Sequence, residues 1–389
     1  MDIGKPPEPL PGTRLLFSLD WSYAHLNHGS FGAMPIAVQR AAQRLRDEQE
    51  ADPMRFFTRG LLERIAHARG HVARFVGAEA SGTAFVPNVT VATAIALASV
   101  ALEPGDEVLR TDHAYGAVAF EIDRRCAETG ATPVRVTIGL DADDDEILAA
   151  VLGGVTPRTR VAVIDHVTSP TARLFPVRRL VAELRQRDVV VMVDGAHAPG
   201  MLDVDVAGIG ADFWFANLHK WAFAPRGTGL LVVAPEHRAR VRPVAVSWQH
   251  TAGFPASVEY QGTVDYSGWL AAPSGVFTLT SLGLRTVREH NTRLARYGQR
   301  LLTEALGTEP VGGSPAPSMR VVRLPDGTVH NEADAIAVRE KIAAHLRTHV
   351  AIGSWQGTGL LRLCAQVYNR AEEYERLAAA LPAVLRRAD

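Results

Sequence analysis

Cysteine and net charge are both scarce in this chain of 389 residues. The two cysteines, Cys126 and Cys364, form no CxxC pair and no metal-ligand cluster, so we expect neither a disulfide framework nor a metal site. Lys and Arg total 41 against 42 Asp and Glu, which leaves a formal net charge of -1. Because there is no basic excess, we expect neither nucleic acid nor an anionic membrane surface among its partners.

Long hydrophobic runs and leader patterns are also missing. The longest apolar run, Val89 to Leu102, is shorter than a membrane span and contains two threonines and a serine. The first ten residues have no apolar core behind a basic head, so they do not resemble a signal peptide, and we expect a cytoplasmic protein. No GxGxxG motif follows the first predicted strand, which argues against a Rossmann-type dehydrogenase.

Short apolar runs alternate with helical patterns between residues 83 and 233. The predicted strands are 83–86, 107–111, 133–138, 160–166, 189–194, 213–215 and 229–233. The predicted helices are 35–50, 60–75, 88–101, 115–129, 143–153 and 176–186. This alternation predicts an α/β fold with a mostly parallel sheet and helices on both faces. Such sheets bind ligands beyond the carboxyl ends of their strands.

Two domains suit a chain of this length. The proline-rich start predicts an N-terminal arm over 1–34, followed by a large domain over 35–275. Residues 243–275 are rich in Gly, Pro, Trp and Tyr and predict a long functional loop. A crossing helix over 278–306 then leads to a small α+β domain, so that 276–389 forms the C-terminal part.

A lysine and an aspartate stand at the ends of two of these strands. Lys220 follows the aromatic run 213–215, and Asp194 ends the β-branched run 189–194. Pyridoxal phosphate (PLP) chemistry needs such a pair, because the lysine amine forms a Schiff base and the carboxylate keeps the pyridine nitrogen protonated. Either residue alone is more simply a surface lysine or a turn-forming aspartate, but together they favour a PLP site.

Further polar residues follow the strand ends. Asn88, Val89 and Thr90 open a helix directly after a strand, where free backbone N–H groups and a hydroxyl suit a phosphate, although a plain N-cap fits equally well. Asn217 and His219 flank the lysine and could donate to the same phosphate.

Aromatic and basic side chains complete the candidate set. His113 or Tyr115, after the strand 107–111, would stack on the cofactor ring, unless the segment is only a strand-end turn. His197 would reach the ring hydroxyl, although a lone histidine is more often structural. Arg362 sits between apolar residues in a predicted strand, where a substrate carboxylate or a salt bridge inside the small domain would serve equally as its partner.

These motifs, taken in order, resemble the class V aminotransferase branch of the fold-type I PLP enzymes, and within it the isopenicillin N epimerase-like group. The matching segments are LNHGSFG at 26–32, VDGAHAPG at 193–200, HKW at 219–221, QGTVD at 261–265, and Arg362 with Tyr368 and Asn369. The resemblance covers nearly the whole chain and is more specific for family and cofactor than for reaction.

The resemblance implies a role for each candidate. Lys220 would carry PLP, Asp194 would pair with the pyridine nitrogen, and His197 would lie near the ring hydroxyl. His113 would be the stacking residue by position, with Tyr115 as its rival. The residues implied for the phosphate are Val89, Thr90, Asn217 and His219. The residues implied for the substrate are Asn27 and Arg362, the latter for its α-carboxylate.

Two further implications concern the assembly and one excluded reaction. Thr263 would reach across from the second subunit of a homodimer. Desulfurases of this family need a nucleophilic cysteine on a loop before the matching arginine, but the segment 350–359 has none, and Cys364 follows Arg362 on a strand. A persulfide-forming desulfurase is therefore disfavoured.

The expected function is chemistry at the Cα of an amino acid or of an amino-acid-containing metabolite. Lys220 would take the α-proton while Arg362 fixes the carboxylate. Reprotonation on the opposite face, by His or Tyr or through a water, would make an epimerase or racemase, our first expectation. Loss of a β-substituent would make a C–S lyase, and reprotonation at the cofactor carbon an aminotransferase. A catalytically idle PLP-binding relative is a further alternative.

Overall fold

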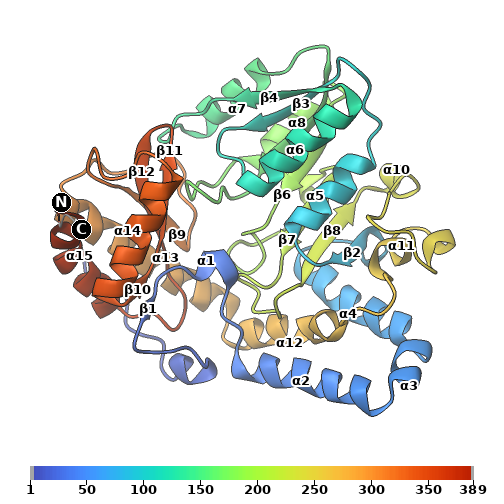
Figure 1. The fold of residues 1–389 in the computed structure, drawn as a ribbon, viewed down its shortest axis with the longest axis horizontal. Coiled ribbons are helices and arrows are strands. Elements are labelled where there is room, and N and C mark those ends of the chain that lie inside the picture. Colours follow the sequence, from blue (N-terminus) through green and yellow to red (C-terminus); the bar gives the residue numbers. More distant parts are fainter. Residues whose placement is uncertain (1–3, 387–389) are drawn as a thin grey trace.

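A computed structural model describes residues 4–386; residues 1–3 and 387–389, the ends of the predicted arm and C-terminal part, lie outside the described residues. A seven-stranded sheet forms the centre, in the order β2-β8-β7-β6-β5-β3-β4 (Figure 1). Its strands are β2 (Thr83–Val86), β3 (Glu107–Thr111), β4 (Thr132–Val136), β5 (Thr159–Asp165), β6 (Val190–Asp194), β7 (Phe213–Asn217) and β8 (Gly229–Val233). β8 runs antiparallel to β2 and β7, and the other neighbours are parallel. The predicted mostly parallel α/β sheet is confirmed.

Helices cover both faces of this sheet (Figure 1). They are α2 (Ile36–Ala51), α3 (Pro53–Thr58), α4 (Leu61–Phe75), α5 (Val89–Ala98), α6 (Gly116–Thr129), α7 (Asp144–Gly153), α8 (Val177–Arg185), α9 (Val206–Ile209), α10 (Pro235–Arg238) and α11 (Ala256–Glu259). Val163 and Met192 share a core with α5 and α6, whereas their neighbours Ala162 and Val191 share another with α4 and α8. The strands read as continuous apolar runs because both of their faces are buried. None of the described helices has the length and apolar content of a membrane span.

A smaller C-terminal domain stands beside the large sheet (Figure 1). Its antiparallel sheet has the order β11-β12-β9, and β1 of the N-terminal segment pairs in parallel with β10. The bounds are β1 (Ala24–His25), β9 (Met319–Arg323), β10 (Thr348–His349), β11 (Ala351–Trp355), β12 (Thr358–Cys364), α14 (Glu332–Leu346) and α15 (Ala371–Arg386). After β1, the chain passes through α1 (His28–Phe31) to the large domain. The predicted limits of arm and domains remain predictions.

The predicted crossing helix over 278–306 is in fact two helices. α12 (Ser267–Ser281) and α13 (Leu284–Leu306) are separated at Gly283, whose φ is 83°. α12 also occupies the end of the predicted loop 243–275. It packs against α2, α4 and the sheet core, so its sequence has no single apolar stripe. Gly275 makes the composition resemble that of a loop, but it is needed for packing, because a Cβ there would lie 2.7 Å from the backbone nitrogen of Ala224.

Candidate active site

A cavity of about 230 Å³ opens at the carboxyl ends of β5, β6 and β7. It is lined by Ser30, Phe31, Asn88, Val89, Thr90, Tyr115, Asp165, Val167, Ser169, Asp194, Ala196, His197, Asn217, His219 and Lys220. The predicted site residues among them are Val89, Thr90, Tyr115, Asp194, His197, Asn217, His219 and Lys220. They meet here because parallel strands deliver their carboxyl ends to one edge of a sheet.

Lys220 is held in a buried hydrogen-bond chain. Its Nζ lies 3.2 Å from His197 Nε2, and the Trp221 indole nitrogen lies 3.2 Å from His197 Nδ1. Since an indole N–H can only donate, Nδ1 accepts, and the proton of the neutral imidazole is on Nε2. That N–H therefore points at a lysine nitrogen that can accept only when it is uncharged.

The electrostatics of this pair agree with its geometry. Burial lowers the pKa of Lys220 to about 8, and it lowers the pKa of His197 well below its usual value. The carboxylate of Asp194 opposes the effect on the lysine without cancelling it. The arrangement holds a largely neutral, nucleophilic amine at moderately alkaline pH.

Asp194 ends β6 and lines the same cavity. One of its oxygens, Oδ1, accepts the backbone N–H of Ala196 at 2.8 Å. Burial raises the pKa of Asp194 to about 6, while the Ala196 N–H and Lys220 favour its ionised form. A carboxylate in this setting suits a protonated pyridine nitrogen.

The backbone on which Lys220 sits is fixed by close contacts from the N-terminal segment. Gly32 has a φ of 69°, and a Cβ there would lie 2.0 Å from the carbonyl oxygen of His219. His28 Nε2 lies 2.9 Å from the carbonyl oxygen of Lys220, and His28 Nδ1 lies 2.9 Å from the Tyr368 hydroxyl. The segment 26–32 therefore positions the lysine backbone.

The start of α5 forms a polar end of the cavity. Asn217 Oδ1 accepts the Val89 N–H at 3.0 Å, so that amide is already satisfied, whereas the Thr90 amide has no partner within residues 4–386. Free donors at a helix start suit a phosphate. His219 Nδ1 lies 3.2 Å from the Thr228 carbonyl oxygen and must donate to it. Burial lowers the pKa of His219 to about 4, so its Nε2 must gain a proton before it can donate to a phosphate.

Arg362 lies behind two of the lining serines. Its Nη1 donates to the carbonyl and hydroxyl oxygens of Ser169 at 2.5 and 3.1 Å, and its Nη2 donates to Asn27 Oδ1 and Ser30 Oγ at 3.1 and 3.0 Å. Its Nε has no partner, and no Asp or Glu within residues 4–386 forms an ion pair with it. Burial lowers its pKa. Asn27 thus orients the arginine. Neither Asn27 nor Arg362 lines the cavity itself, and Nε is the guanidinium nitrogen left without a hydrogen bond.

His113 is not brought to the cavity. Its Nδ1 lies 2.6 Å from the Thr171 hydroxyl and its Nε2 lies 2.9 Å from the Ile138 carbonyl oxygen. Its ring packs against Trp355 at 4.7 Å between centroids. Both ring nitrogens of His113 are engaged by other protein groups, and the ring does not line the cavity as the expected stacking on the cofactor requires. Tyr115 lines the cavity instead.

Two other predicted features also lie away from the cavity wall. Thr263 is exposed and does not line the cavity of its own chain, so its contribution to a second subunit stays a prediction. Cys126 and Cys364 are both buried, and burial raises the pKa of each thiol. Within residues 4–386, no thiol lines the cavity.

Sequence reasoning missed several lining residues, of which Asp165 is the most notable. It ends β5 directly beside Asp194 at the end of β6. The available signal was that an aspartate closes each of two apolar strands. Ser30 and Phe31 lie inside the segment 26–32 but were not singled out, and Ser169 carries no recognisable signal.

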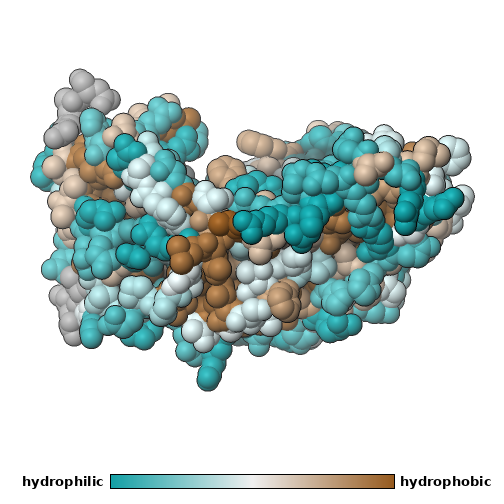
Figure 2. Space-filling view, turned by 90° about the horizontal axis from the view of Figure 1, so that it is seen from below, coloured by the Kyte–Doolittle hydropathy of each residue, from teal (hydrophilic) through white to brown (hydrophobic). Residues whose placement is uncertain are grey.

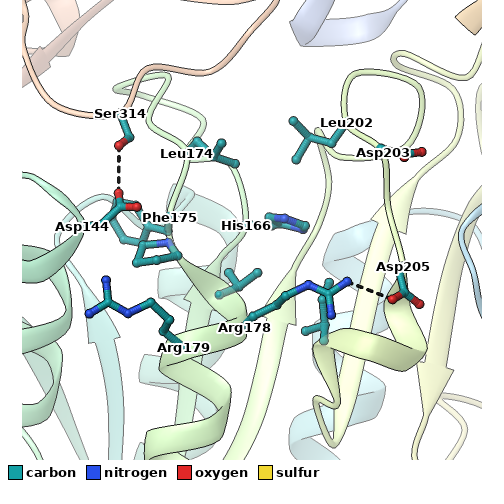
Figure 3. A pocket seen from close by; sticks show the side chains of 13 residues that line it. Asp144, His166, Leu174, Phe175, Arg178, Arg179, Leu202, Asp203, Asp205 and Ser314 are labelled. Carbon is teal, nitrogen blue, oxygen red and sulfur yellow. Dashed lines mark hydrogen bonds and ion pairs between the residues drawn. The ribbon is translucent and has the colours of Figure 1, made fainter. Parts of the chain in front are cut away.

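A second cavity, of about 440 Å³, lies beside α8 (Figure 3). Arg178 Nη2 lies 2.9 Å from Asp205 Oδ2, and the Ser314 hydroxyl donates to Asp144 at 2.8 Å. No lysine lines this cavity, and its Arg178 is already paired. The cavity at the strand ends holds the buried lysine together with Asp194 and is the candidate active site.

Comparison with known proteins agrees with this site. Residues 41–377 match the aminotransferase class-V family. Isopenicillin N epimerase of Streptomyces clavuligerus is 33% identical over 386 residues, covering 94% of this chain and 96% of that protein. L-cysteine desulfhydrase of Arabidopsis thaliana is 30% identical over 391 residues, covering 91% and 86%. A C-DES variant with glycine covalently linked to its PLP has a TM-score of 0.84 at 19% identity, covering 96% and 99%, which shows the fold.

Enzymes of this family use PLP. The buried lysine, the carboxylate at the end of β6 and the free donors at the start of α5 fit that cofactor. The chain belongs to the aminotransferase class-V family and is a PLP-dependent enzyme of fold type I.

Proposed function

We propose that this enzyme moves a proton at the Cα of an amino acid or amino-acid-containing metabolite, as an epimerase or racemase. The observation that carries the proposal is the placement of two proton-bearing side chains in the cavity. Lys220 follows β7 and Tyr115 follows β3, and β6 and β5 lie between these strands in the sheet. A substrate held over the ends of β5 and β6 would have a proton carrier on each side.

Arg362 is the residue proposed to bind the substrate carboxylate. Its rigid guanidinium suits a bidentate contact, and its present partners are neutral oxygens that an anion can outcompete. Asn27 and Ser30 fix the plane of the guanidinium. Fixing the carboxylate in turn fixes the direction of the Cα–H bond.

The proton movements can be assigned to this chain's own groups. PLP, when bound, supplies an electron-withdrawing ring that weakens the bonds at Cα. Lys220, with a pKa lowered to about 8, takes the α-proton on one side. Tyr115 returns a proton on the other side, which inverts the configuration. His197 Nε2–H is free to donate to the ring hydroxyl when the lysine nitrogen changes partner.

A C–S lyase is the second candidate. The L-cysteine desulfhydrase relative is 30% identical over most of this chain, nearly as similar as the epimerase. Loss of a β-substituent needs the same α-proton removal by Lys220 but no proton donor on the opposite side. Neither cysteine lines the cavity, so a persulfide on the protein is not part of this proposal.

We also propose a homodimer that closes the cavity. Phe31 and Tyr115 line the cavity and yet are 72% and 47% exposed. Other exposed large apolar side chains are Phe120, Val244, Val246, Trp248 and Phe277. Figure 2 shows hydrophobic side chains gathered near the middle of the face seen from below. Exposed apolar surface of this kind is typical of an interface, across which Thr263 would approach the partner's phosphate site.

Incubation with a panel of amino acids in D2O tests the reaction. An epimerase or racemase gives both configurations with deuterium at Cα and no loss of amino acid. A C–S lyase, with one water consumed, releases ammonia, a 2-oxo acid and hydrogen sulfide from cysteine, and an aminotransferase forms a 2-oxo acid only while an amino-group acceptor is supplied. PLP-loaded enzyme that exchanges no Cα proton in any substrate would contradict the proposal.

A further inference from the structure

Two aspartates end neighbouring strands at the cavity. Asp165 of β5 and Asp194 of β6 are register partners in the parallel pair. Because side chains alternate along a strand, Asp165 continues the face of Val163, and Asp194 that of Met192. Both carboxyl groups therefore point to the same side of the sheet, and both line the cavity. Adjacent strands lie about 4.8 Å apart, so the two groups are immediate neighbours.

The surroundings treat the two carboxyl groups differently. The carboxylate of Asp194 accepts a hydrogen bond from the Ala196 N–H, and the charge of Lys220 favours its ionised form. No side chain within residues 4–386 donates to Asp165 or forms an ion pair with it. Its own backbone N–H favours the ionised form, but burial, together with the charge of Asp194, outweighs this and raises the pKa of Asp165 well above the usual value. The titratable groups that line the cavity with the pair are Tyr115 after β3, His197 after β6, and His219 and Lys220 after β7, and Arg362 of β12 lies behind Ser169.

Two buried carboxyl groups in one site cannot both ionise without a large cost. A protonated pyridine nitrogen supplies one positive charge and so balances one carboxylate. We propose that Asp165 is a positioning residue of the cofactor site: an un-ionised carboxylic acid that donates a hydrogen bond toward Asp194 and leaves the pair with a single negative charge. The inference rests on the proposed attachment of PLP at Lys220.

Substitutions separate this role from that of a second carboxylate. Asp165→Asn keeps the shape and a hydrogen-bond donor, so PLP affinity should stay within about twofold of wild type. Asp165→Ala removes the donor and should weaken PLP about tenfold, as expected for one hydrogen bond to a charged group. If Asp165 were ionised, Asp165→Asn would remove a charge and weaken PLP as strongly as Asp194→Asn does. Equilibrium binding of PLP, followed by absorbance, measures these affinities without any substrate.

Infrared spectroscopy of the holoenzyme in D2O reads the proton directly, since an un-ionised carboxylic acid has a C=O band that carboxylates lack. Glu259 must be distinguished, because burial raises its pKa to about 7. Carbon-13 labelling of aspartate alone should therefore shift a wild-type band at about pH 7.5, where most free aspartate is ionised. The band should vanish in Asp165→Asn and persist in Asp203→Asn, a carboxyl that is 97% exposed.

A labelled wild-type holoenzyme without a shifted band would overturn the inference, and so would a band that survives in Asp165→Asn. The wild-type measurement needs no variant, so a missing band overturns the inference even if Asp165→Asn does not fold. It also needs no substrate, so its failure is distinguishable from failure of the proposed reaction.

Discussion

Two of the cavities in the described part of this molecule differ in how the charge of their arginines is balanced. Beside α8, Arg178 pairs with Asp205 at 2.9 Å, and Arg179 pairs with Asp145 at 2.7 Å (Figure 3 shows the first pair). At the strand ends, Arg362 has no ion-pair partner within residues 4–386, and it is buried. The arginines that line the α8 cavity are thus paired by the protein itself, whereas the arginine behind the strand-end cavity is not.

This difference identifies the reactive cavity better than volume does. A buried, unpaired cation costs several kcal/mol and persists where a ligand supplies the missing partner. An ion pair at the rim of the α8 cavity contributes about 0–1 kcal/mol to stability, and its charges are already balanced without a ligand. Substitutions of matched residues in the two cavities should therefore differ strongly in their effects on the binding of PLP and substrate.

The largest effect is expected for Lys220→Ala. Without the amine, no covalent link to PLP can form, and exchange at Cα should fall by at least about 10³-fold because the proposed base is lost as well. The absorbance of the covalently bound cofactor measures the first effect. Lys5→Ala, at an exposed lysine, is the matched control and should behave as wild type. A Lys220→Ala protein that still holds PLP covalently would remove the basis of the site.

Next in size is the comparison of Arg362→Ala with Arg179→Ala. Loss of a charge-assisted contact costs about 1.5–3 kcal/mol, so kcat/KM should fall roughly 10- to 150-fold for Arg362→Ala. Arg179→Ala removes a surface ion pair beside α8 and should leave kcat/KM within about twofold. Steady-state kinetics with the best substrate of the amino-acid panel tests this. Equal losses in both variants would contradict the contrast between the cavities.

A smaller effect is expected from pH. Imine formation needs the neutral amine, and burial lowers the pKa of Lys220 to about 8. The reactive fraction should therefore rise roughly tenfold between pH 7 and 9 and then level off. Stopped-flow absorbance of apo-protein mixed with PLP measures the rate. A rate that keeps climbing to pH 10, as for an exposed lysine, would show that the amine is not perturbed.

The last comparison concerns two glycines with similar φ but different ψ, -7° at Gly12 and 163° at Gly32. Gly12 and Gly32 have φ values of 71° and 69°, but only at Gly32 would a Cβ meet a backbone atom, the His219 carbonyl oxygen. Gly12→Ala should cost about 1–2 kcal/mol for the left-handed conformation alone. Gly32→Ala should cost about 1–3 kcal/mol for a backbone region used almost only by glycine and about 1–3 kcal/mol through overpacking, and it should weaken PLP binding because the lysine backbone moves. Thermal unfolding without PLP measures the loss of stability, and unfolding with PLP measures the loss of PLP binding. If the two variants behaved alike, the close approach of position 32 to the His219 carbonyl oxygen would have no role in holding the lysine.

Much of the strand-end chemistry could be predicted from sequence, because apolar strands followed by polar residues locate the carboxyl edge of a parallel sheet. Lys220, Asp194 and Thr90 are of this kind. Which of His113 and Tyr115 enters the cavity could not be predicted, since that depends on Thr171 and Ile138, which belong to other segments and engage the histidine.

Other misses have equally specific causes. α12 is buried against several elements, and Gly275 and Pro273 give it the composition of a loop. Asp165 lies inside the predicted strand 160–166, and its significance depends on its register with Asp194 across the sheet, which the sequence does not show. Asn27 belongs to a matching motif, but its contact with Arg362 joins residues 335 positions apart.

Reduction of the PLP-loaded enzyme with borohydride, followed by peptide mapping, tests the central claim most directly. Lysine occurs at positions 5, 220 and 341 in this chain, so the assignment is unambiguous. A single pyridoxyl adduct on the peptide that contains Lys220 is the predicted result. An adduct at Lys5 or Lys341 instead, or no adduct at all, would contradict the account.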